Sequence, residues 1–249
     1  DAAAARSIEP ALNQDTAFAG AIHLPDDGVG NCRQFALMLR RQAEALGATF
    51  KFNTTVARIS ASPEATVSIA NEATPRRFDA IVVCAGLASA ALLRPLGVKI
   101  PMAAVYGYSI SANIREPLNA PRSAVMDERY KVAISRLGLR VRVAGSAEIG
   151  GRLDTKRPAA LQTLYKVLHD WFPGAAQMSG GVQEWKGARP MLPDGPPIVG
   201  ASGVPGIWLN LGHGPSGWAL SCGSARAVAD LVGGRTPDVD LQGLGIERL

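Results

Sequence analysis

The sequence has few of the residues on which metal and thiol chemistry depend. It contains three cysteines and three histidines among 249 residues. The cysteines are far apart and form no CxxC pair: Cys32, Cys84 and Cys222. We therefore expect reduced thiols and no disulfide framework. Because the histidines lack the spacing of metal ligands, we also expect no metal centre.

Long apolar runs and clustered charges are also missing. No run approaches the roughly 18 apolar residues of a membrane span, and the start DAAAARS has no apolar signal-peptide core. The net charge is +5, yet basic residues are scattered and aromatics make up only 6%. This pattern argues against a nucleic-acid partner. Hydrophobic content of 47% favours one large or two modest globular domains in the cytoplasm.

One stretch near the end of the chain reads as strand, tight turn and helix. Ile207 to Leu211 is apolar and β-branched, which predicts a buried strand. Gly212, Gly214 and Gly217 then form a GxGxxG pattern. Apolar residues at helical spacing predict a helix from Ser216 to Val232, ended by two glycines.

This turn has two interpretations, a tight connection without a ligand or a binding site for an electron-rich group. Glycine lets the backbone approach a ligand closely, and a helix start offers N–H groups and partial positive charge. A dinucleotide pyrophosphate site would need an acidic residue at the end of a second strand. Asp238 and Asp240 lie in a polar tail instead. The pattern therefore favours another part of a cofactor.

The rest of the chain predicts two interleaved domains. Asn31 can cap an amphipathic helix that Gly47 ends, whereas residues 1–20 predict little structure. The βα part has strands at 49–60, 65–70 and 80–84 and a short helix at 89–93. An antiparallel meander follows, with strands at 106–113, 123–126, 130–135, 139–144 and 182–187 and a helix from Pro158 to Phe172.

The predicted fold class is thus α/β plus α+β. We expect a poorly patterned start at 1–22, a discontinuous and partial doubly wound domain at 23–100 and 188–249, and an antiparallel-sheet domain at 101–187. Four prolines between Pro190 and Pro197 stiffen the return to the first domain.

Several motifs along the chain resemble the D-amino acid oxidase superfamily of FAD enzymes, and most closely the bacterial D-amino acid dehydrogenase small subunits. RPMLPDGPPIVG begins at Arg189, and GHGPSGWALSCGS begins at Gly212. Further motifs are IEPAL, LPDDGVGNCRQFA, VVCAG, GYS and MDERYKVAISRLG. The family's own amino-terminal GxGxxG would lie upstream of Ile8, so the resemblance covers the later part of a family member.

The resemblance implies that the doubly wound domain is a partial FAD/NAD(P)-binding domain and that the antiparallel-sheet domain binds the substrate. It also implies an FAD site built from three segments. Val56 would meet the adenine through its backbone, and Ala85 and Gly86 would border the FAD. The glycine turn would face the flavin through Gly212, His213, Gly214, Pro215, Ser216 and Gly217. N–H groups between Gly214 and Gly217 could stabilise charge at flavin N1 and the C2 oxygen. From the residues alone, the sequence favours Val56 as a core residue.

Oxidation of an amino acid requires that its carboxylate be held while Cα faces the flavin. Arg189 is the candidate, because a planar guanidinium forms two parallel hydrogen bonds with a carboxylate. The alternative is a surface ion pair. Tyr130 and Tyr108 are candidates for a helping hydroxyl, and buried sheet tyrosines are the alternative.

The expected function is FAD-dependent oxidative deamination of a D-amino acid by hydride transfer. A glycine, sarcosine or hydroxyproline oxidoreductase is a second hypothesis, and a non-catalytic binding module without flavin is a third. The electron acceptor would be oxygen, a membrane quinone or another carrier, and a quinone would place the protein at the inner membrane.

Overall fold

The computed structural model describes residues 1–61, 63–122 and 124–249. They form two compact units. Unit 1 consists of residues 1–42 and 106–187, and unit 2 of residues 43–105 and 188–249. Each unit is therefore discontinuous in sequence. Residues 23–42, which we predicted in the doubly wound domain, belong to unit 1. The first residue of the predicted strand 123–126 lies outside the described residues.

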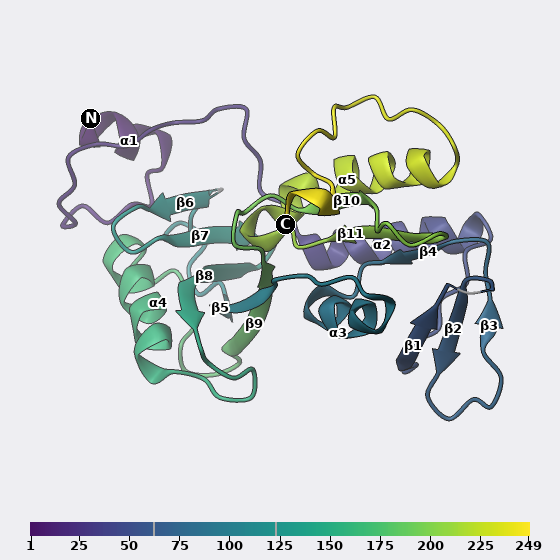
Figure 1. Ribbon diagram of the computed structural model, residues 1–249. Coiled ribbons are helices and arrows are strands. Elements are labelled where there is room, and N and C mark those ends of the chain that lie inside the picture. The colour runs from purple at the N-terminus through teal and green to yellow at the C-terminus, as the bar shows by residue number, and fades with distance from the viewer. Residues whose placement is uncertain (62, 123) are drawn as a thin grey trace. The chain divides into compact units, whose positions relative to one another are not determined.

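Unit 1 is built on a five-stranded sheet in the order β6-β7-β8-β5-β9 (Figure 1). The strands are β5 (Ala103–Asn113), β6 (Ala124–Asp127), β7 (Val132–Leu137), β8 (Arg140–Ile149) and β9 (Gln183–Met191). Residues of β5 before Tyr106 and of β9 after Gly187 belong to unit 2. β6, β7 and β8 pair antiparallel in register. This is the meander that alternating apolar residues and short polar connections predict.

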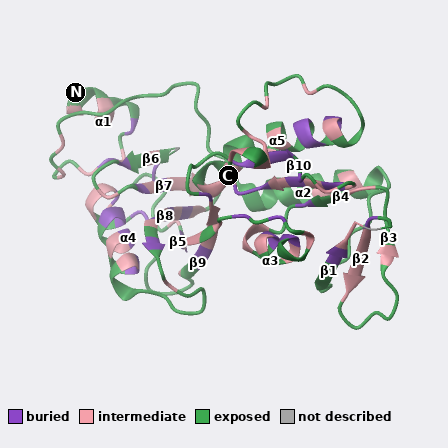
Figure 2. Ribbon diagram, in the orientation of Figure 1, coloured by how far each residue is buried: buried purple, intermediate pink, exposed green. Residues whose placement is uncertain are grey.

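Helix α4 (Pro158–Trp171) packs on β7 and β8 and closes the core of unit 1. Proline at its first position fits, because that position needs no backbone donor. Its buried stripe meets the sheet, whereas its opposite face is exposed (Figure 2). Phe172, Leu164, Ile134 and Tyr108 are among the residues buried there. The predicted stripe of this helix is therefore core.

The prediction of little structure for residues 1–20 is wrong. Helix α1 (Ala2–Ile8) begins at Asp1, whose side chain accepts a hydrogen bond from the Ala4 N–H. The following segment is tied to the end of α4, because the Asn13 N–H donates to the Trp171 carbonyl at 2.8 Å. The alanine-rich sequence has no apolar periodicity that would indicate a helix. The Asp1 cap fixes the start of α1, and the long-range hydrogen bond of Asn13 fixes the segment that follows.

Helix α2 (Cys32–Ala45) has the predicted bounds, with Asn31 Oδ1 accepting from the Gln34 N–H at 3.1 Å. It buries none of its residues (Figure 2). Phe35, Met38 and Leu39 are exposed large apolar residues on it. No helix among the described residues is long and apolar enough to cross a membrane.

Unit 2 contains a three-stranded sheet in the order β10-β11-β4. β10 (Ile198–Ala201) and β11 (Ile207–Leu211) pair antiparallel, and β11 runs parallel to β4 (Ile81–Val83). Helix α5 (Gly217–Val232) packs on β10 and β11 (Figure 1). The parallel pair followed by a helix is the predicted doubly wound element.

The remaining elements of unit 2 are short. β1 (Val56–Ser60), β2 (Thr66–Ile69) and β3 (Arg76–Arg77) form a second sheet. Helix α3 (Ser89–Leu93) has the predicted bounds, and 3₁₀ helices η1 (Gly86–Ala88), η2 (Arg94–Leu96), η3 (Gly214–Ser216) and η4 (Ile246–Arg248) connect the larger elements. Ile207, Leu209 and Leu211 point into a core that also contains Val83 and Leu192.

Several predicted strands differ in their bounds, and β3 and β10 were not predicted as strands. β8 extends to Ile149, where the prediction ended it at Ala144. The strand predicted at 49–60 begins only at Val56, because that is where pairing with β2 starts. β9 continues through Arg189 to Met191, where the prediction ended it at Gly187. β10 was expected only as the end of a stiff link. The strand was missed because Pro196 and Pro197 directly before it indicate a loop. It pairs with β11, the next strand along the chain.

A buried ion pair connects the sheet of unit 1 with the loop before α4. Lys186 Nζ lies 2.9 Å from Glu148 Oε2, and their side chains are 2% and 9% exposed. The same ammonium donates to the carbonyls of Arg152 and Thr155, each at 2.6 Å. Tyr108 donates its hydroxyl hydrogen to Glu148. Every donor of Lys186 thus has an acceptor, which is the condition for burying a charge.

Stability should fall in acid through Glu148. The Tyr108 hydroxyl and then Lys186 hold the pKa of Glu148 below its ordinary value. A lowered folded-state pKa contributes stability above the unfolded value of about 4.3, and this contribution is lost as pH falls through the folded-state pKa. Urea midpoints at pH 7, 5 and 3.5 should therefore drop more for wild type than for Glu148→Gln. Parallel curves for the two proteins would rule this contribution out.

Candidate cofactor and substrate site

The glycine turn joins β11 to α5 within unit 2. Gly212 and Gly214 have φ values of +76° and +52°. Side-chain-bearing residues rarely adopt this left-handed region, so the backbone conformation itself requires glycine. Gly214 begins η3, and Gly217 begins α5. The predicted strand, turn and helix are therefore present, with the helix one residue shorter at its start.

The segment after Arg189 forms the wall behind this turn. Met191 and His213 form an isolated antiparallel bridge. A Cβ at Gly212 would lie 2.5 Å from Leu192 Cδ1, and one at Gly214 would lie 2.7 Å from Met191 Sδ. Real Cβ atoms do not approach so closely. The two glycines thus bring the turn into direct contact with Met191 and Leu192.

His213 is held neutral inside the turn. Burial lowers the pKa of its imidazole, because the charged form is less well solvated there. Its Nε2 lies 3.0 Å from Ser224 Oγ, and that hydroxyl donates to the Ser221 carbonyl at 3.4 Å. The Ser224 hydroxyl can donate to either partner, so this contact is compatible with both imidazole tautomers.

The start of α5 is suited to an anion. Within the described chain its N-cap residue Ser216 makes no side-chain cap, and its first turn holds no acidic residue. The first N–H groups of a helix lack intrahelical partners and carry partial positive charge. Asn210, at the end of β11, adds a buried Oδ1 for which the described residues supply no donor. Both features leave room for a ligand with an electron-rich edge and a hydrogen-bond donor.

Two other predicted cofactor segments also belong to unit 2. Ala85 and Gly86 follow β4, and Gly86 has a φ of +55° with nothing within 4 Å of an added Cβ. That space is open to a neighbouring group. Val56 is the first residue of β1, pairs with Ile69 and is 38% exposed. Its side chain is not core, so the purely structural interpretation loses its main support.

Arg189 is a half-buried residue of β9, two positions before Met191. Burial lowers the pKa of its guanidinium. An arginine side chain ordinarily loses its proton only far above neutral pH, so the group stays charged at pH 7. A half-buried guanidinium is able to bind a carboxylate with little competition from water.

The two candidate tyrosines lie in unit 1. Tyr108 is 1% exposed, donates to Glu148 and accepts from the Arg157 N–H at 3.1 Å. Tyr130 lies between β6 and β7, with Lys166 Nζ 5.5 Å from its ring centroid. The hydroxyl of Tyr108 thus already makes two hydrogen bonds within the protein, which makes Tyr130 the better candidate for contacting the substrate. The role of each tyrosine remains a prediction.

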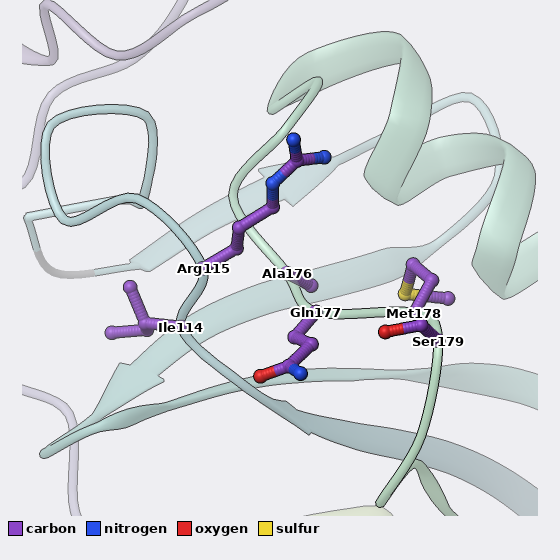
Figure 3. A pocket seen from close by; sticks show the side chains of 6 residues that line it. All are labelled: Ile114, Arg115, Ala176, Gln177, Met178 and Ser179. Carbon is purple, nitrogen blue, oxygen red and sulfur yellow. The ribbon is translucent and has the colours of Figure 1, made fainter.

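A cavity of about 450 Å³ in unit 1 lies apart from these segments in the sequence. It is lined by Ile114, Arg115, Ala176, Gln177, Met178 and Ser179. Figure 3 shows the side chains of Arg115 and Gln177 pointing to opposite sides. Its polar groups therefore do not converge on one ligand.

Among the described residues, no group of three or more His, Cys, Asp or Glu could hold a metal ion.

Four residues at the turn were missed by sequence reasoning. Met191, Leu192 and Ser224 contact the turn, and Asn210 precedes it. Met191 and Leu192 could have been found from the sequence, because they follow Arg189 in the same motif. Ser224 is the last residue of the motif that begins at Gly212, so the sequence also contained a signal for it.

Comparison with known proteins gives three kinds of likeness. Residues 1–231 match the model of the FAD dependent oxidoreductase family, DAO. A D-amino acid dehydrogenase of Bradyrhizobium diazoefficiens is 42% identical over 243 residues, which are 97% of this chain and 58% of that protein. One from Cereibacter sphaeroides is 43% identical over 251 residues, with 100% and 57% covered. The chain thus spans less than two thirds of the length of these relatives.

Solved structures share the fold. Glycine oxidase from Geobacillus kaustophilus superposes with a TM-score of 0.87 at 24% identity, covering 98% of this chain and 65% of that one. L-proline dehydrogenase from P. horikoshii superposes with a TM-score of 0.82 at 16% identity, covering 99% and 67%. These likenesses confirm the predicted fold class.

Alanine at Gly212 should destabilise the protein. The added Cβ would meet Leu192 and occupy a left-handed backbone region, so we expect a loss of about 1–3 kcal/mol in the free energy of unfolding. Gly223→Ala is the matched control, because Gly223 lies inside α5 with nothing within 4 Å of an added Cβ. Helix propensity should make that variant more stable by about 0.5–1 kcal/mol. Equal urea midpoints for the two variants would contradict the close contact.

Proposed function

The chain belongs to the FAD dependent oxidoreductase (DAO) family, and from this premise we propose that it forms the substrate side and the flavin-facing turn of an FAD-dependent D-amino acid dehydrogenase. The observation that carries the proposal is the uncapped, acid-free start of α5 behind a turn that only glycine permits. The identity to D-amino acid dehydrogenases over nearly the whole chain supports the substrate class.

The residues present fit FAD. Asn210 Oδ1 is a buried acceptor that needs a donor, and the space at Gly86 admits a neighbouring group. The N–H groups of Gly214 and Gly217 would hold the electron-rich pyrimidine edge, because Pro215 has no N–H and that of Ser216 donates to the His213 carbonyl at 3.2 Å. Val56 and Ala85 would border the rest of the cofactor. When bound, FAD accepts a hydride from the amino acid Cα, leaving an imine that water converts to a keto acid and ammonia.

Arg189 would bind the substrate carboxylate in two parallel hydrogen bonds. This fixes one end of the substrate and thereby orients Cα. The substrate amine must be neutral when hydride leaves, so its proton goes to water. Neutral His213 contributes no positive charge to the site. The helix dipole and the amides of the turn supply the stabilisation of negative charge, and Tyr130 is the candidate for an additional hydroxyl.

Anaerobic reduction of the flavin tests this function. The natural polypeptide that carries this sequence and the 249-residue chain are each mixed with FAD and then with D-alanine, L-alanine, glycine or sarcosine. We expect loss of flavin absorbance with D-alanine, and none with L-alanine. Reduction by glycine or sarcosine alone would favour the second hypothesis. A protein that never binds FAD would favour the non-catalytic one.

In the same assay, Arg189→Lys should lose far more activity toward D-amino acids than toward simple amines. Lysine keeps the charge but loses the paired contact, and we expect a fall in kcat/KM of about 10²-fold. Simple amines have no carboxylate, so their rates serve as the internal control. Equal losses for both substrate types would remove Arg189 from this role.

A further inference from the structure

Arg248, in η4, connects two segments of unit 2 that are far apart in sequence. Its Nε donates to Asp194 Oδ2 at 2.6 Å, and its Nη2 donates to the Pro196 carbonyl at 2.6 Å. Its Nη1 donates to the Gly245 carbonyl at 3.0 Å within its own segment. The Arg248 side chain is 14% exposed. One guanidinium thus fixes the 194–196 turn to the end of the chain described here.

The segment that Arg248 holds is the wall of the candidate site. It begins at Arg189, continues through Met191 against the turn, and reaches the core at Leu192. The Gly195 N–H donates to the Leu192 carbonyl at 3.3 Å, which closes a turn around Asp194. Movement of Asp194 would therefore displace Leu192 and Met191, the two residues that contact Gly212 and Gly214.

The composition of this segment explains why it needs an outside donor. Four of its residues are prolines: Pro190, Pro193, Pro196 and Pro197. Proline has no N–H, so the segment has few backbone donors with which to fix itself. A guanidinium supplies several donors in one plane, which suits a carboxylate and a carbonyl side by side. The Arg248 hydrogen bond also holds the pKa of Asp194 below its ordinary value, so the pair is charged at neutral pH.

We propose that Arg248 is a positioning residue for the site: it fixes the segment from Arg189 to Pro197 against the glycine turn and so sets where Arg189 stands relative to that turn. The part of this inference that concerns substrate rests on the proposed function. The part that concerns the segment and the turn rests on the contacts alone. Arg248 itself contacts neither the turn nor any reacting group in this account.

The first readout needs neither FAD nor substrate. Met191 Sδ lies next to Gly214, so the methyl signal of ¹³C-methyl-labelled Met191 reports on the packing of the turn. The signal is assigned with Met191→Leu. Arg248→Gln should shift or broaden it. The matched control is Arg235→Gln, which also removes one arginine–aspartate hydrogen bond, here to Asp230 at 2.8 Å near the end of α5. That control leaves Asp230 paired with Arg226 and should leave the Met191 signal in place.

The second readout is kinetic and uses the natural polypeptide loaded with FAD. Arg248→Gln should raise KM for the D-amino acid about tenfold or more with a smaller change in kcat, because a displaced Arg189 binds the carboxylate less well. Arg235→Gln should match wild type. Arg248→Lys keeps the charge but lacks the planar guanidinium that donates to Asp194 and Pro196 together. If Arg248 is a positioning residue, this variant should therefore resemble Arg248→Gln.

The outcomes separate the two proposals. If wild type oxidises no amino acid, the proposed function fails, and the Met191 signal still decides the positioning role. If either readout of Arg248→Gln matches that of Arg235→Gln, or if Arg248→Lys restores wild-type behaviour in both, the positioning role is wrong. Should Arg248→Gln fail to fold, Asp194→Asn removes the carboxylate partner while keeping Arg248 bound to Pro196, and the same criteria apply to it with smaller expected changes.

Discussion

The contact between the glycine turn and the residues after Arg189 is the constraint on which the site depends. Gly212 and Gly214 bring backbone to within reach of Leu192 and Met191, where any Cβ would overlap. The turn thereby ends β11, starts α5 and fixes the strand that carries Arg189. The predicted anion site at the start of α5 and Arg189, the predicted partner of the substrate carboxylate, thus belong to the same compact unit. Such placement is a condition for binding cofactor and substrate with defined geometry.

Electrostatics at this turn come from the backbone. The histidine in the motif is half-buried, which lowers its pKa and favours the neutral form, and the first turn of α5 contains no acidic residue. Positive potential is therefore supplied by peptide N–H groups, which cost no reorganisation when a ligand arrives. Arg189 contributes the only charge that the account requires, and burial strengthens its attraction for a carboxylate. A glycine motif otherwise typical of phosphate binding is thereby suited to a flavin edge.

The sequence predicted those parts of the molecule whose signals are local. β11 and α3 have the predicted bounds, and those of α2, α4 and α5 differ from the prediction by at most one residue at one end. Caps, prolines and apolar periodicity mark these elements in the sequence. α1, β10 and the end of β9 were missed or misplaced, because α1 is alanine-rich without apolar periodicity, prolines directly precede β10, and β9 contains Pro190. At the site, the glycines and Arg189 were evident, whereas Arg248 lies more than 50 residues from Asp194 and Pro196 and had no signal.

The central claim is that the amides of the turn face the flavin, and a titration followed by NMR measures this directly. In protein labelled with ¹⁵N-glycine, FAD is added and the amide signals are followed. The account predicts that the signals of Gly212, Gly214 and Gly217 move, and that those of Gly233 and Gly234 at the other end of α5 stay in place. Movement of the second pair alone, or of neither group while FAD binds, would contradict it.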